Sequence, residues 1–120
     1  MTAMEREDFV AAGIDYDKGV ARFAGKADLY VNFLRKFPKD DTFAQLSAAM
    51  DAGDMTAAFA AAHTLKGVTG NLSLDGLYQS VLPLVEALRG AGNMELAASL
   101  FPPVKTEYEH TMDFLRTLPE

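Results

Sequence analysis

Two side chains able to do chemistry near neutral pH lie three residues apart: the imidazole of His63 and the ammonium of Lys66. Neutral imidazole is a good nucleophile at this pH, because its unperturbed pKa is about 6.5. Positions three apart in a helix are neighbours on one face. If this segment is helical, a nucleophile and a positive charge stand side by side.

The helix predicted over residues 55–74 has two unlike faces. Apolar residues repeat along one side at helical spacing, which predicts a seam packed into a bundle core. They are Ala58, Ala61, Leu65, Val68 and Leu72. His63 points almost opposite this seam. The face that carries His63 also carries Thr56, Phe59, Ala60, Lys66, Gly67 and Gly70.

Three features make the His63 face unusual for a solvated surface. Residues 55–74 contain no Asp or Glu in a chain with a net charge of −6, as suits a site for a phosphoryl anion. Gly67 and Gly70 each cost a helix up to about 1 kcal/mol relative to Ala, which indicates a close approach to the backbone. Phe59 places an aromatic ring one turn before His63, as a docking surface would.

Each feature also has an ordinary structural explanation. Most surface histidines have no special role, and a glycine near a helix C-terminus can simply end the helix. The ring of Phe59 can lean sideways into the core. Their coincidence on one face favours a functional site.

The elements that position this face are predicted to be helical. Ala occurs 19 times and Leu 14 times, against 8 Val and Ile together, which favours helix over sheet. The pattern predicts an all-α fold: an antiparallel four-helix bundle with one or two short N-terminal helices packed at one end. We expect a single domain over residues 1–120.

Start and stop signals divide the chain into these helices. Short helices are predicted after a capping box at Thr2-x-x-Glu5 and after Asp15, ending near Gly13 and Gly25. Longer ones follow from residue 28, from 40 or 41, from 55, from 77 and from 94. The predicted interruptions are a break at Pro38, a stop at Gly53 with an N-cap at Asp54, a turn at Asp75-Gly76, a bend at Pro83 and a break or kink at Pro102-Pro103.

Several function classes are disfavoured. The absence of Cys excludes disulfides, thiolate zinc sites and thiol catalysis, and His63 and His110 share no metal-ligand spacing. We expect His110 to be solvated or packed. The chain has no glycine-rich phosphate loop for ATP, and no basic face for nucleic acid. No apolar run is long enough for a bilayer, so a cytoplasmic protein is expected.

The residues around His63 resemble a known signature. His63-Thr64-Leu65-Lys66-Gly67, followed by Val68-Thr69-Gly70-Asn71-Leu72, looks like the motif of histidine-containing phosphotransfer (HPt) domains. Ala52-Gly53-Asp54 and earlier segments match as well, so the resemblance covers nearly the whole chain. The family often has Gly where Ser73 stands, and we expect Ser73 to crowd one edge of the docking face slightly.

The resemblance implies a phosphocarrier rather than an autonomous enzyme. His63 would take a phosphoryl group from an aspartyl phosphate on a receiver domain, through Nε2, and pass it to another receiver. Lys66 would hold the phosphoryl oxygens, while Gly67 and Gly70 admit the loops of the partner. Phe59, Ala60 and Asn71 would form the surrounding contact.

The expected partners are receiver domains of response regulators or of a hybrid histidine kinase. The chain itself would hold no cofactor or metal, and Mg²⁺ would come with the receiver. As in most of the family, a monomer is expected.

Two alternatives remain open. A helical adaptor would dock signalling partners without phosphotransfer, although His63, Lys66 and Gly67 are all present. A phosphoacceptor module of a larger, chemotaxis-type kinase would share the same motif, although these 120 residues leave no room for a catalytic domain.

Overall fold

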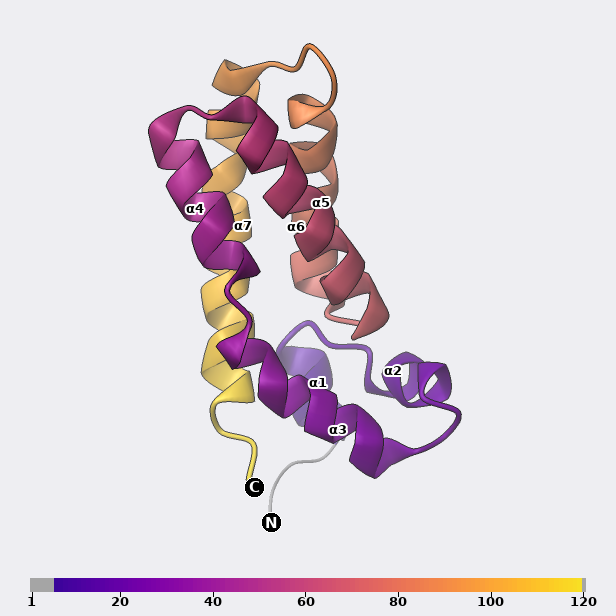
Figure 1. Cartoon of the computed structure of the whole chain (residues 1–120). Coiled ribbons are helices and arrows are strands. Elements are labelled where there is room, and N and C mark those ends of the chain that lie inside the picture. The colour runs from indigo at the N-terminus through magenta and orange to yellow at the C-terminus, as the bar shows by residue number, and fades with distance from the viewer. Residues whose placement is uncertain (1–5, 120) are drawn as a thin grey trace.

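Four long helices form an antiparallel bundle in the computed structural model, which describes residues 6–119 (Figure 1). They are α4 (Thr42–Ala52), α5 (Met55–Asn71), α6 (Asp75–Leu88) and α7 (Met94–Leu115). Helix α5 packs between α4 and α6, and α6 packs against α7. The described residues are helical with no strand, so the predicted all-α bundle is confirmed.

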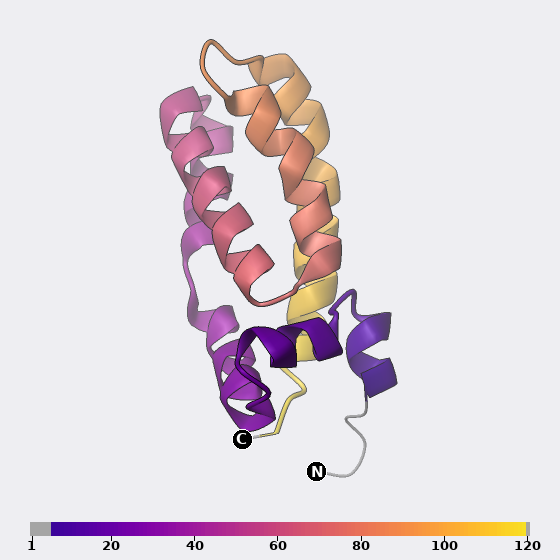
Figure 2. The same ribbon diagram turned by 90° about the vertical axis from the view of Figure 1, so that its right-hand side faces the viewer.

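Three shorter helices occupy one end of this bundle, where one or two were expected. They are α1 (Arg6–Ala11), α2 (Tyr16–Arg22) and α3 (Ala27–Lys36). Figures 1 and 2 show them gathered beyond the turn that joins α5 to α6. A 3-10 turn, η1 (Phe37–Lys39), separates α3 from α4 and contains Pro38, so the break predicted at that proline occurs.

The predicted seam of α5 faces the core. Ala58, Ala61, Leu65 and Leu72 are buried, and Val68 is partly buried against the core. Across the bundle, Phe43 of α4 stacks on Tyr108 and Phe101 of α7, at ring-centroid distances of 3.9 and 5.8 Å. These large rings fill the space between α4 and α7 and close the bundle.

The predicted caps fix where α5 and α2 begin. The Asp54 carboxylate accepts a hydrogen bond from the backbone N–H of Ala57 at 3.0 Å, just after Gly53 ends α4 with a φ of 66°. Asp15 caps α2 in the same way through the N–H of Lys18. The capping box proposed at Thr2 and Glu5 lies outside the described residues.

The turn predicted at Asp75-Gly76 was placed wrongly. These two residues form the first turn of α6, and the chain reverses just before them, after α5 ends at Asn71. Gly76 instead lies at a tertiary contact: its N–H donates to the carbonyl of Gly13 at 2.9 Å, and a Cβ there would stand 2.9 Å from Glu107 Oε2 and 3.6 Å from the Gly13 Cα. The glycine therefore marks a tertiary contact rather than a turn.

Of the break or kink predicted at Pro102-Pro103, the break does not occur. Helix α7 runs continuously through both prolines, as α6 does through Pro83. All three proline residues are exposed, so water can solvate the carbonyls that lose an N–H partner. Val104, directly after the pair, is fully buried and keeps α7 against the core.

The reversal between α5 and α6 depends on a strained residue, Ser73. Its φ is 55°, in the left-handed region, its side chain is fully buried, and its Oγ has no hydrogen-bond partner among the described residues. Ser73 therefore does not crowd the docking face as expected. Its backbone conformation is the physical reason why glycine suits this position.

We therefore expect Ser73→Gly to stabilise the fold. Relief of the left-handed strain and loss of the unsatisfied hydroxyl outweigh the chain entropy of glycine, for a net gain of about 1 kcal/mol. Thermal unfolding followed by circular dichroism measures it, and the midpoint should rise by a few degrees. Ser73→Ala, which removes only the hydroxyl, separates the two contributions. An unchanged or lower midpoint for Ser73→Gly would contradict the assigned strain.

Candidate functional site on helix α5

His63 is the ninth of the seventeen residues of α5, and its side chain is exposed. Ala62, one residue before His63, and Leu65, two residues after it, are fully buried, so the core holds the backbone that carries the imidazole. Within residues 6–119 the ring forms no hydrogen bond or ion pair. Its one aromatic neighbour there is Phe59, at a centroid distance of 5.7 Å.

A hollow of about 460 Å³ opens beside His63. It contains five of the seven predicted site residues, namely His63, Lys66, Gly67, Gly70 and Asn71. Four further residues complete its lining: Lys18, Arg22, Asp75 and Tyr78. The structure therefore brings most of the predicted site together and adds side chains from α2 and α6.

Phe59 and Ala60 lie outside this hollow. Ala60 is exposed, whereas Phe59 is half-buried and packs against the core, so its expected exposure is only partial. The Arg89 guanidinium lies 5.3 Å from the centre of the Phe59 ring. The ring of Phe59 thus leans partly into the core, as its ordinary structural explanation holds. Its docking role stays a prediction.

The two glycines of the face have different local surroundings. A Cβ at Gly67 would meet no atom within 4 Å, so nothing in the described fold requires glycine there. A Cβ at Gly70 would stand 3.1 Å from Tyr78 Cε1, which requires that ring to shift. Gly70 therefore has a tight internal contact with α6, and its docking role stays a prediction. At Gly67, by contrast, glycine lowers the stability of the helix although no internal contact requires it.

The Lys66 ammonium has no hydrogen-bond or ion-pair partner in the described part of the chain. Its charge acts on Glu86 of α6, whose carboxylate pairs with Arg89 at 3.0 Å. The hydrogen bond from Arg89 lowers the pKa of Glu86, and the charges of Arg89 and Lys66 lower it further. Because Arg89 holds this carboxylate, the Lys66 ammonium is left available to an incoming anion.

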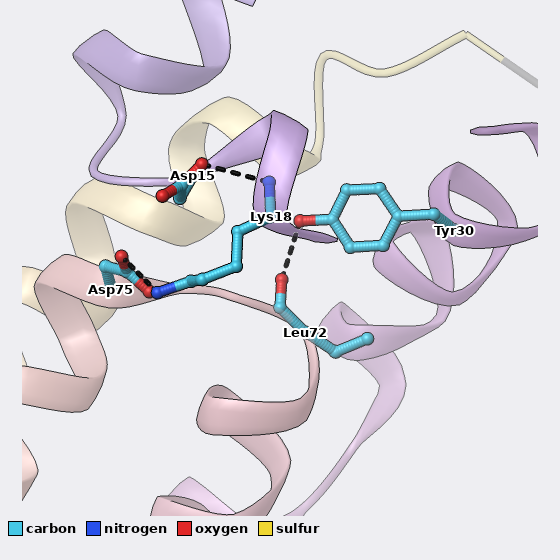
Figure 3. A network of polar contacts seen from close by, with 5 residues as sticks. All are labelled: Asp15, Lys18, Tyr30, Leu72 and Asp75. Carbon is cyan, nitrogen blue, oxygen red and sulfur yellow. Dashed lines mark hydrogen bonds and ion pairs between the residues drawn. The ribbon is translucent and has the colours of Figure 1, made fainter. Parts of the chain in front are cut away.

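Helices α2 and α3 pack against the site through contacts that residue spacing in the sequence does not predict. Figure 3 shows the Lys18 ammonium bound to the Asp75 carboxylate at 2.8 Å, and the Tyr30 hydroxyl donating to the carbonyl of Leu72 at 2.6 Å. Burial, with the charges of Asp15 and Asp75, raises the pKa of Tyr30 far above its usual range, so the phenol remains a donor. These bonds hold the N-terminal helices against the end of α5.

The architecture and the site together define a class: a helical bundle that presents an outward histidine, flanked by a cation, from a central helix. A sequence model of the Hpt domain matches residues 28–116, and the chain belongs to this family. Hpt domains are histidine phosphotransfer modules of phosphorelays, and they interact with receiver domains as phosphocarriers rather than catalysts. Searches of curated proteins and of solved structures found no significant match.

Two further properties bear on partners and cofactors. Among residues 6–119, no helix combines the length and the apolar character needed to cross a bilayer. Within the same residues, no three His, Asp or Glu side chains are grouped to hold a metal ion. The expectation that Mg²⁺ comes with the receiver stays a prediction.

Proposed function

We propose that His63 accepts a phosphoryl group from the aspartyl phosphate of one receiver domain and passes it to the aspartate of another. The observation that carries this proposal is the exposed imidazole at the rim of a cation-lined hollow in a member of the Hpt family. The buried seam of α5 fixes the backbone, so the ring can enter the active site of a partner without the helix moving.

The proposed chemistry is two matched displacements. A lone pair on the neutral imidazole, at Nε2, forms the N–P bond as the O–P bond of the acyl phosphate breaks, and the carboxylate stays on the donor. In the second step, a receiver carboxylate forms a new O–P bond as the N–P bond breaks. Mg²⁺ held by the receiver is expected to offset charge on the transferring group.

A transfer profile against purified receiver domains tests this function. Each receiver is phosphorylated and mixed with the protein, and phosphate is followed over time on both partners. We expect rapid uptake from at least one receiver and transfer onward to another. A helical adaptor would bind receivers without taking label. A kinase module would take label from ATP and a kinase domain but not from a phosphorylated receiver.

Lys66→Ala should slow transfer without unfolding the protein. Removing one positive contact to the phosphoryl oxygens costs about ten- to a hundredfold in rate, because charge-assisted contacts in the transition state are strong. Rapid-quench measurement of phosphate uptake checks this. Lys105→Ala, on the exposed surface of α7, is the charge-matched control. Equal rates for Lys66→Ala and the wild type would remove the role assigned to Lys66.

Gly67→Glu should block receiver docking while leaving the fold intact. Open space around the Cβ position means no internal clash, and Glu forms helix better than Gly. Its bulk and negative charge would oppose an acidic receiver site, weakening binding by at least about tenfold, or 1.4 kcal/mol. Calorimetric titration with a receiver measures this. Gly67→Ala, which leaves the charge unchanged, is the control. Wild-type affinity for Gly67→Glu would exclude a close approach of the receiver to the backbone at this position.

A further inference from the structure

Helix α2 lies outside the region matched to the Hpt family, yet it lines the hollow beside His63. The match begins at residue 28, whereas Lys18 and Arg22 belong to α2, which ends at Arg22. The described lining thus includes three cations, Lys18, Arg22 and Lys66, against one carboxylate, Asp75. This local excess of positive charge stands in a chain whose net charge is −6.

The two cations of α2 are not equivalent. The Lys18 ammonium is bound to the Asp75 carboxylate at 2.8 Å, so each largely offsets the charge of the other. The guanidinium of Arg22 has no ion-pair or hydrogen-bond partner within residues 6–119, and Arg22 lines the hollow that His63 also lines. The unneutralised charge that α2 brings to the hollow is therefore that of Arg22.

Helix α2 is held in place by contacts on several sides. The N–H of Asp15 donates to the carbonyl of Ser73 at 3.0 Å, and the Lys18–Asp75 ion pair ties α2 to the start of α6. Gly19 packs directly on the ring of Tyr30, where a Cβ would overlap the ring. The backbone that carries Arg22 is thus fixed relative to α5 before any phosphate arrives, which lowers the entropy cost of using the guanidinium.

We propose that Arg22 binds the phosphoryl oxygens once His63 is phosphorylated, so that α2 and α5 hold the phosphohistidine between them. This proposal rests on the proposed function in one respect, that His63 carries the phosphate. A guanidinium donates two parallel N–H bonds to phosphoryl oxygens, which suits a doubly charged group better than a point charge does. Arg22 and Lys66 line the hollow from different helices, α2 and α5.

The test uses the full chain, and its first part needs no receiver. His63 is phosphorylated with phosphoramidate, in which the imidazole forms the N–P bond and ammonia leaves. A His110→Gln background removes the other histidine. Phosphorus NMR then follows the apparent pKa of the phosphohistidine in this background and with Arg22→Gln, Arg22→Lys or Arg116→Gln added. Arg116 is an exposed arginine outside the hollow and serves as the matched control.

We expect the apparent pKa to rise by about half a pH unit in Arg22→Gln, because a cation bound to the phosphoryl group favours the less protonated form. Arg22→Lys should restore part of the difference, and Arg116→Gln should show none. In the parent protein, the Nε–H resonance of Arg22 should move downfield on phosphorylation, as a hydrogen bond to phosphate requires.

Other outcomes separate this proposal from the proposed function. An unchanged phosphohistidine pKa with a slower transfer from receivers would overturn the phosphoryl contact and place Arg22 against the partner. Chemical phosphorylation with the expected Arg22 effects, but no transfer from any receiver, would support this contact and reject the relay function. A folded protein in which phosphoramidate leaves His63 unmodified would overturn both.

Discussion

His63→Gln is expected to abolish phosphate uptake from a phosphorylated receiver. Glutamine keeps a polar side chain at an exposed position, but its amide is not a nucleophile, so no N–P bond can form. Because the imidazole makes no hydrogen bond or ion pair within residues 6–119, helical content and unfolding temperature should match the wild type. Receiver binding should persist, which isolates the loss to the chemical step.

The control for this variant is His110→Gln, which alters the chain's other histidine. His110 is exposed on α7, outside the hollow, and its replacement should leave uptake at the wild-type rate. Radiolabel transfer from one phosphorylated receiver compares both variants under identical conditions. Persistent labelling of His63→Gln would move the phosphorylation site elsewhere and reject the assignment of His63.

Leu65→Asp should unfold the protein. Leu65 is fully buried on the seam of α5, two residues from His63, and a carboxylate there would have no partner in an apolar core. The expected loss is about 4 kcal/mol or more, which is most of the stability of a typical small domain. Far-UV circular dichroism and a thermal melt measure it.

Thr64→Asp is the matched control for Leu65→Asp. Thr64 is the adjacent residue but is exposed, so the same charge should leave the fold stable, within about 0.5 kcal/mol of the wild type. The pair tests the rotational phase of α5. If Leu65→Asp melts like the wild type while Thr64→Asp unfolds, the helix is rotated and His63 does not face outward.

Local patterns in the sequence account for most of the fold. The apolar spacing of Ala58, Ala61 and Leu65 predicts which side of α5 is buried, and this outcome follows from helix geometry alone. Asp54 and Gly53 predict their boundary because a cap involves residues close in sequence. Helix periodicity also relates residues that are close in sequence. The sequence alone therefore places His63, Lys66 and Gly67 on one face.

The predictions failed where distant segments decide the outcome. The sequence predicted a turn at Gly76, but this residue lies in the first turn of α6. There it contacts Gly13, which is far away in the chain. The contact between Gly70 and the ring of Tyr78 was not predicted, and Arg22 was missed because only the packing of α2 brings it to the hollow. Contacts of this kind leave no periodic signal in a single sequence.

Direct mapping of the phosphate tests the central claim most sharply. The protein is incubated with a phosphorylated receiver, digested at alkaline pH, and sequenced by mass spectrometry under conditions that preserve N–P bonds. We expect a single phosphate on His63, stable in alkali and lost in mild acid. Phosphate on any other residue would contradict this claim. So would the absence of phosphate on folded protein that binds a receiver able to phosphorylate other carriers.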